Sequence, residues 1–260
     1  MISITERYRD PAVVAALREK YLAAQPFQHV ILDGVFPDEQ LRTVIADFAQ
    51  VKHNGKYFDD TTQLKFSCDQ WELFPHSTLE AITFLNCGTF VNFLAELTGI
   101  GTLTSDPYLH GGGMHETFPG GFLKMHTDFN FHKILRLDRR INAIVYLNEG
   151  WQPDWGGHLV LANRAMSTQI SVEPVFNRMV VFNTNDHSFH GQPDPLKFPR
   201  GGSRKSLAMY YYSKGRPENE ITSHKIGTSY RARYSGDFPL SARLREKARL
   251  WLGRKRPPAE

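Results

Sequence analysis

The sequence predicts a mainly β protein with flanking helices, folded as a single domain. Apolar and polar residues alternate along residues 121–132, 141–148 and 203–212, and this period of two is typical of β-strands. Segments with helical spacing lie in the first hundred residues and near the C-terminus. At 260 residues with 41% apolar content the chain can bury a full core, and β-rich barrels of this length are commonly one domain.

The first hundred residues are expected to supply helices that pack against the sheet. Residues 27–36 are typical of a strand and turn, and residues 37–39 open a helix with an apolar stripe at helical spacing. A Ser-x-x-Glu capping box predicts a second helix over residues 77–98, with Gly99 directly after its end. Both apolar stripes are interpreted as core packing.

A histidine and a carboxylate suggest metal chemistry in the first alternating segment. His126 and Asp128 are two residues apart, so their side chains lie on the same face of an extended strand. The tripeptide alone is a weak motif, but a second histidine follows about sixty residues later and an arginine shortly after it. Two histidines and one carboxylate in this order form the facial triad that is diagnostic of non-haem Fe(II) oxygenases.

The second histidine must be chosen from two candidates, His187 and His190, which would point to opposite faces of one extended segment. Residues 180–182 resemble a buried strand, and residues 183–186 have turn chemistry. An extended run then restarts at residues 188–190. We therefore predict that His190 is the metal ligand and that His187 has a hydrogen-bonding role nearer the loop.

An arginine on the last alternating segment is the candidate for binding a carboxylate. Arg204 and Ser206 lie on one face of the strand predicted over residues 203–212. A guanidinium stays charged and binds carboxylate bidentately, so this pair suits one end of a dicarboxylate. Arg200 is a weaker candidate, because it lies in a Pro/Gly loop where exposure is expected.

With these residues in place, the chain resembles the Fe(II)/2-oxoglutarate-dependent dioxygenases of the prolyl-4-hydroxylase-like superfamily. The resemblance covers residues 100–215 well and the first hundred only in general layout; the stretches that carry it are 120–129, 155–161, 177–182, 189–193 and 203–207. It implies a double-stranded β-helix, or jelly roll, with iron at one mouth. Collagen-type prolyl hydroxylases hold the distal carboxylate with lysine, so Arg204 in that role argues against a collagen-like substrate.

The resemblance also implies a set of roles and cofactors. His126, Asp128 and His190 would bind Fe(II), and Arg204 and Ser206 would hold the C5 carboxylate of 2-oxoglutarate. O2 would take the remaining metal position, and ascorbate is a further candidate cofactor. The reaction would release succinate and CO2 and usually end in hydroxylation, with the hard chemistry supplied by the metal and the cosubstrate.

Several other residues have two open interpretations. Asn142 and Tyr146 share one face of residues 141–148, where each could bind 2-oxoglutarate or substrate, or serve a structural role. His115 follows three glycines and could contact substrate or be an ordinary surface histidine. The tryptophans of residues 151–155 could cover the site or cap the barrel edge. The tyrosines of residues 210–212 are interpreted as core and edge packing.

Two alternative functions remain open on the sequence alone. One is a cupin-like metal-binding protein or isomerase with a jelly roll but no 2-oxoglutarate turnover, in which Arg204 and Ser206 would have no purpose. The other is a non-catalytic scaffold that works through its basic tail, which the intact ligand set disfavours. In the resembling superfamily substrates include prolyl residues of peptides, free amino acids, glycans and small metabolites.

The charge of the chain is uneven, and its basicity is a property of the C-terminus. Nine Lys or Arg and three acidic residues lie between residue 229 and the end, which leaves the remaining body at about −2. We expect one dioxygenase domain over residues 1–239, followed by a basic helix and tail over residues 240–260. A helix docked on the barrel is favoured; contact with nucleic acid or an acidic membrane is the alternative.

Composition also bounds the cellular setting. Two cysteines, Cys68 and Cys87, argue against a disulfide framework and fit a reducing compartment. The N-terminus lacks the apolar core of a signal peptide, and no apolar run reaches 18 residues. We therefore expect a soluble, cytoplasmic protein that acts on a small-molecule or peptide substrate.

Overall fold

One strongly curled antiparallel β-sheet dominates the computed structural model, which describes residues 2–51, 54–199, 201–220 and 224–231. Its main path has the strand order β1-β11-β8-β13-β5-β3-β6-β12-β9-β10. The strands are β1 (His29–Asp33), β2 (Lys56–Asp59), β3 (Gln63–Cys68), β4 (Thr104–Ser105), β5 (Gly113–Thr117), β6 (Phe122–Thr127), β7 (Phe131–His132), β8 (Leu137–Tyr146), β9 (Leu159–Ala162), β10 (Gln169–Val172), β11 (Arg178–Asn183), β12 (Phe189–Gln192), β13 (Arg204–Ser213) and β14 (Ser229–Tyr230). The predicted mainly β jelly roll is confirmed.

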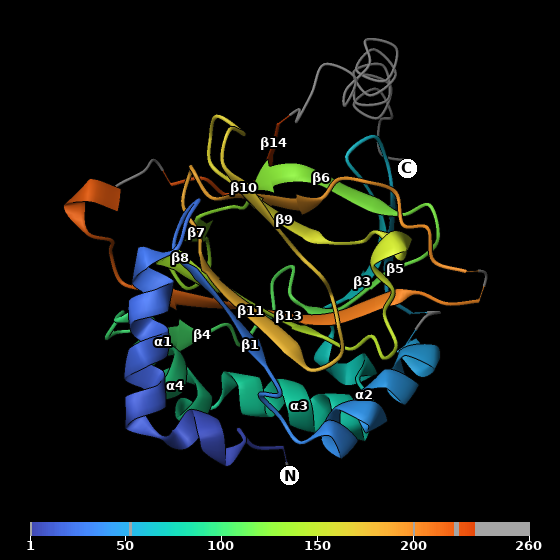
Figure 1. Cartoon of the computed structure of the whole chain (residues 1–260), viewed down its shortest axis with the longest axis horizontal. Helices are drawn as coiled ribbons and strands as arrows, with labels where there is room; N and C mark the ends of the chain where they lie inside the picture. Colours follow the sequence, from blue (N-terminus) through green and yellow to red (C-terminus); the bar gives the residue numbers. More distant parts are fainter. Residues whose placement is uncertain (1, 52–53, 200, 221–223, 232–260) are drawn as a thin grey trace, which may run out of the picture.

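The sheet folds over on itself into two facing layers. A larger layer runs from β1 to β3, and a smaller one contains β6, β12, β9 and β10. Strand β3 joins the layers, since it pairs with β5 through Phe66 and with β6 through Gln63. In Figure 1 the smaller layer lies above the larger one; three of the helices lie below both layers, and the first helix of the chain stands along the left side. Side chains on the inner faces of both layers therefore converge on the space between them.

Four α-helices cover the outer face of the larger layer (Figure 1). They are α1 (Pro11–Ala23), α2 (Asp38–Val51), α3 (His76–Asn86) and α4 (Gly88–Thr98); the 3₁₀ turns are η1 (Glu6–Arg9), η2 (Trp71–Leu73), η3 (Pro153–Trp155) and η4 (Glu218–Glu220). Alternation sends Val181 and Met209 outward into the main core, where Phe48 of α2 also packs. The neighbouring Phe182 points inward and packs with Tyr146 between the layers. The predicted packing of both apolar stripes is confirmed.

The prediction of one helix over residues 77–98 is wrong. Cys87 is extended, with φ −76° and ψ 157°, and separates α3 from α4. The break lets Phe84 and Phe90 pack against each other and both against Phe36, at ring-centroid distances of 5.9, 6.3 and 6.1 Å. The break at Cys87 thus occurs together with the packing of these aromatic rings. The helix signals in the local sequence do not predict it. The helix end at Gly99 is confirmed, because that glycine is left-handed with φ 75°.

The predicted capping box is also wrong, because α3 is capped from another helix. The helix begins at His76, and Pro75 before it provides no side-chain cap. Instead, the buried carboxylate of Asp47 in α2 accepts bonds from the Thr78 backbone N–H and hydroxyl, both at 2.8 Å. One carboxylate thus satisfies a free N–H of the first helical turn and ties α2 to α3.

Replacing Asp47 with alanine is expected to lower the free energy of unfolding by about 1–3 kcal/mol, since two buried donors lose their acceptor. Asp47→Asn should lose less, because an amide oxygen still accepts. Asp59→Ala, at an exposed position of β2, is the control. Urea unfolding with an unchanged m-value measures the effect; equal midpoints for Asp47→Ala and Asp59→Ala would contradict this account.

No single helix in the described ranges is long and apolar enough to span a membrane, although the bent pair α3 and α4, which meet at 49°, passes that test by length and composition. The predicted basic C-terminal helix and Arg200 lie outside the described residues.

Candidate active site

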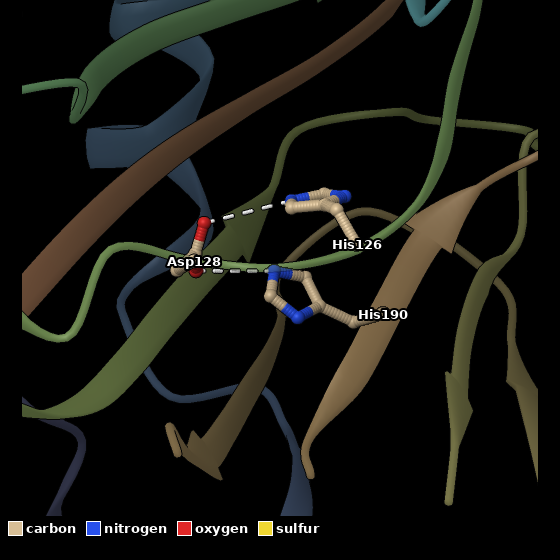
Figure 2. A group of neighbouring side chains, drawn as sticks. All are labelled: His126, Asp128 and His190. Carbon is tan, nitrogen blue, oxygen red and sulfur yellow. Dashed lines mark ion pairs between the residues drawn. The ribbon is translucent and has the colours of Figure 1, made fainter. Parts of the chain in front are cut away.

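Two neighbouring strands of the smaller layer bring the predicted ligands together. His126 near the end of β6 lies opposite His190 in β12, and Asp128 follows the last residue of β6. Figure 2 shows the three side chains pointing toward one another. The Asp128 carboxylate oxygens lie 3.5 Å from His126 Nε2 and 3.2 Å from His190 Nε2. One ligand atom from each residue lies within 4.8 Å of the others.

The hydrogen bonds of the histidines fit metal ligation. His126 Nδ1 lies 2.8 Å from the Lys124 carbonyl, and His190 Nδ1 lies 3.2 Å from the Ser188 carbonyl. If each Nδ1 carries the proton and donates to its carbonyl, both Nε2 lone pairs face the carboxylate. Two imidazole nitrogens and one carboxylate oxygen then converge from one side, which is the donor set of the facial triad. The residues present therefore fit Fe(II).

The competing histidine lies elsewhere. His187 is exposed and precedes β12, where its backbone N–H bonds to Asn185 Oδ1. The structure thus brings His190, and not His187, to His126 and Asp128.

Two side chains from β8 hold the carboxylate of the triad. Asp128 Oδ2 accepts bonds from Arg139 Nη2 and Asn142 Nδ2, both at 2.8 Å. Asn142 in turn accepts from Arg139 through its Oδ1, at 3.0 and 2.7 Å. Burial by itself raises the pKa of Asp128, but the Arg139 guanidinium opposes burial most strongly, and that pKa is held well below its ordinary value. The carboxylate is therefore fixed in position and ionised.

Asn142 accordingly has a structural bond at the site, one of the two roles left open by the sequence. Arg139 was not predicted, because strict alternation from Asn142 would turn Arg140 inward instead. A bulge shifts the register between Tyr211 and Tyr212, so that Tyr212 lies opposite Arg139 and Arg140 is skipped. The sequence Asp-Arg-Arg at residues 138–140 indicated that an arginine could lie near the site. Only the bulge determines that the first of the two, Arg139, points toward Asp128.

The tyrosine run 210–212 differs from its prediction at one position. Tyr211 and Tyr212 are fully buried packing residues, as expected. Tyr210 instead lines the site, where the Arg139 guanidinium lies 3.4 Å from its ring centroid. Burial of its hydroxyl raises the pKa of Tyr210 to about 12, and the Arg139 guanidinium partly opposes that rise. This ring supports the arginine that holds Asp128.

A cavity of about 220 Å³ extends from the triad between the two layers. Of the residues predicted to form the site, it is lined by all except Tyr146: His126, Asp128, His190, Arg204, Ser206 and Asn142. Ser206 is buried beside Tyr146, its partner across the strands. His115 also lines this cavity, where burial and then Lys65 lower its pKa. The histidine is therefore part of the cavity wall and not an ordinary surface residue.

Arg204 is a buried cation with no carboxylate partner among the described residues. Its Nε donates to the Gly157 carbonyl at 2.7 Å, and its Nη2 donates to Tyr146 Oη at 3.2 Å. Burial lowers the pKa of Arg204, and Tyr146 partly opposes that effect. Burying a guanidinium without a counter-charge is costly. The side chain is thus oriented by neutral groups and lacks an anion, which fits a carboxylate ligand.

The tryptophan loop borders this arginine. Trp151 is buried and packs on Trp155 and Phe198, with ring centroids 5.5 and 5.3 Å away. Neither tryptophan lines the cavity. The tryptophan loop therefore fits the second of its two predicted roles, capping the barrel edge near Gly157. The first role, covering the site, has no support because neither tryptophan contacts the cavity.

The site geometry agrees with comparisons to known proteins. Residues 112–212 match the model of the 2OG-Fe(II) oxygenase superfamily, a segment that contains all three triad residues and Arg204. No curated protein sequence matches the chain significantly. The segment that contains the triad and Arg204 is thus similar to the 2OG-Fe(II) oxygenase superfamily, and the jelly-roll fold agrees with that similarity.

Solved structures share the fold at low sequence identity. A prolyl-4-hydroxylase from Pseudomonas putida superimposes with a TM-score of 0.56 at 20% identity, over 78% of this chain and 100% of that one. A prolyl hydroxylase from Trichoplax adhaerens, in complex with a hypoxia-inducible-factor peptide fragment, gives 0.58 at 13% identity over 79% and 91%. The α-ketoglutarate-dependent epimerase SnoN of nogalamycin biosynthesis gives 0.56 at 11% identity over 89% and 88%.

Proposed function

We propose that this protein is an Fe(II)- and 2-oxoglutarate-dependent oxygenase that hydroxylates an unactivated C–H bond of a small-molecule or peptide substrate, with release of succinate and CO2. The observation that carries the proposal is the unpaired, buried guanidinium of Arg204 in the cavity that also contains the triad. In a cupin-like metal protein without 2-oxoglutarate, no bound carboxylate would offset the free-energy cost of burying this cation.

The residues divide the work between metal binding and cosubstrate binding. His126, Asp128 and His190 would hold Fe(II), which, with 2-oxoglutarate and O2, supplies the oxidising chemistry when bound. Arg204 would bind the C5 carboxylate through a charge-assisted pair, and Ser206 would donate its hydroxyl. Arg139 and Asn142 keep the Asp128 carboxylate ionised and oriented, because their bonds fix the oxygen that faces His190.

The fold relatives support a range of outcomes. The Pseudomonas and Trichoplax proteins are described as prolyl hydroxylases, whereas SnoN is described as an epimerase. Fold alone does not select among these outcomes, because function depends on the residues of the site. We propose hydroxylation because two of the similar solved structures are described as prolyl hydroxylases.

The proposal predicts that the purified protein converts 2-oxoglutarate to succinate in a manner that needs both Fe(II) and O2. Many oxygenases of this kind would be expected to turn over slowly without substrate, so succinate is measured over hours by mass spectrometry. Chelator-treated protein and protein under anaerobic conditions are the controls.

Binding provides a second readout that does not depend on turnover. Protein loaded with redox-inert Zn(II) should bind 2-oxoglutarate in a calorimetric titration, and metal-free protein should bind it much more weakly. Equal binding with and without metal, combined with no succinate, would contradict the proposed function and favour a metal-binding protein of another kind.

A further inference from the structure

A second cation, Lys65, lines the same cavity and has no role in the proposed function. It lies in β3 on the same face as Gln63 and Ser67, which also line the cavity. No carboxylate in the described part of the chain forms an ion pair with Lys65; its nearest aromatic contact is Phe58, with the ring centroid 5.7 Å from Nζ. A lysine that faces a cavity without a counter-charge is a candidate ligand-binding group.

The strand register places Lys65 in one row with Arg204. Lys65 precedes Phe66, which pairs with Glu116 of β5, and the next residue of β5, Thr117, pairs with Arg204. With strand β5 between them, the backbones of the two cations are roughly 10 Å apart. Both side chains therefore belong to the same inner wall but start from different strands.

The charged ends of the two side chains contact different strands. Arg204 bonds to Tyr146 of β8, which lies on the side of β13 away from β5. Lys65 instead contacts Phe58 of β2 and is half-buried, whereas Arg204 is buried. Arg204 and Lys65 thus serve different parts of the cavity.

The Asp128 carboxylate of the triad interacts electrostatically with Lys65. Burial lowers the pKa of Lys65 to about 8; the Asp128 carboxylate opposes this effect, and Arg204 adds to it less strongly. Asp128 acts on Lys65 through space but is already bonded to Arg139. An anion bound at Lys65 would therefore lie close to the triad without competing for an existing partner.

A count of charges shows that the loaded site still lacks an anion. Among the residues that the structure describes, the charged side chains lining the cavity are the cations Lys65, Arg139 and Arg204 and the anion Asp128. Arg139 and Asp128 neutralise each other, and Fe(II) and the 2-oxoglutarate dianion carry equal and opposite charges. A net charge of +2 therefore remains. When the C5 carboxylate pairs with Arg204, one excess positive charge lies at the metal and the other at Lys65.

We propose that Lys65 is the substrate-binding cation of this site and that the substrate is a small carboxylic acid whose carboxylate pairs with it. The cavity of about 220 Å³ must hold both cosubstrate and substrate, which favours a small molecule. This inference rests on the proposed function. It adds that the carboxylate anchors the substrate beside Lys65 and directs its C–H bonds toward the triad.

The test compares matched acids and neutral amides as probes. A panel of short-chain and N-acetyl amino acids, each with its primary amide, is titrated into Zn(II)-loaded protein with and without saturating 2-oxoglutarate. Ligand-observed NMR and calorimetry report binding. In wild-type protein the best acids should bind at least about 10-fold more tightly than their amides, the scale expected for a charge-assisted bond.

Three variants decide whether Lys65 is responsible. Lys65→Met should abolish the acid preference, and Lys65→Arg should retain most of it. Lys56→Met is the matched control, because Lys56 contacts the same Phe58 ring at 4.7 Å but does not line the cavity, and it should behave as wild type. In all three variants 2-oxoglutarate affinity should stay within about fivefold of wild type.

Several results would overturn the inference. They are an absence of acid preference in wild-type protein, including no binding of any acid or amide, and an acid preference that survives in Lys65→Met. A loss of 2-oxoglutarate affinity in Lys65→Met as large as in Arg204→Met would assign Lys65 to the cosubstrate instead. If wild-type protein shows the Lys65-dependent preference but binds no 2-oxoglutarate, the proposed function fails and the anion site stands.

Discussion

Replacing Asp128 with alanine is expected to abolish tight binding of divalent metal and all succinate production. The substitution removes the only carboxylate among the described residues that line the cavity, and it leaves Arg139 buried without its anion. Metal affinity should fall by more than the 10- to 100-fold that typically follows loss of a residue supporting a ligand. His126→Ala and His190→Ala should give losses of the same order, because each removes one of three donors. Calorimetric titration with Zn(II) measures the affinity.

The control for this series is His187→Ala, which removes an exposed histidine three residues from His190. It should bind metal with wild-type affinity and retain succinate production. Thermal unfolding of the metal-free proteins separates loss of the site from loss of the fold. If His187→Ala lost metal while His190→Ala kept it, the choice of the second histidine would be reversed.

Replacing Arg204 with methionine should weaken 2-oxoglutarate binding by about 10- to 150-fold, which corresponds to about 1.5–3 kcal/mol for a charge-assisted hydrogen-bonded pair. Metal affinity should change little, because Arg204 bonds to Gly157 and Tyr146 and not to the triad. Arg204→Lys keeps the charge but loses the planar fork, so its affinity should be intermediate. Calorimetric titration of 2-oxoglutarate into Zn(II)-loaded protein gives the dissociation constants.

Arg200→Ala is the comparison for this prediction, since Arg200 is the competing arginine in the sequence. It should leave 2-oxoglutarate affinity close to that of wild type. A larger effect from Arg200→Ala than from Arg204→Met would move the cosubstrate contact to the loop before β13 and remove the main support for the proposed function.

Local patterns were sufficient to predict which residues of one strand share a face. The alternation that groups Arg204 with Ser206 is confirmed by β13, and that of residues 141–148 by β8 up to its end at Tyr146. The side-chain period of a strand is fixed by backbone geometry, so it can be read without knowing the partners. The same reasoning failed for α3 and α4, where aromatic packing around Phe36 accompanies a break inside one helical pattern.

The sequence by itself thus predicted a mainly β fold from strand periodicity. It predicted the candidate residues of the triad and of the carboxylate site from residue type, from their order along the chain and from alternation within each strand. Only the tertiary structure decided which distant residues complete the site. Arg139 reaches Asp128 because a bulge skips Arg140, and Lys65 joins the cavity because β3 pairs with both layers of the sheet. Strand register and bulges arise from contacts between segments far apart in the chain, so no local pattern contains them.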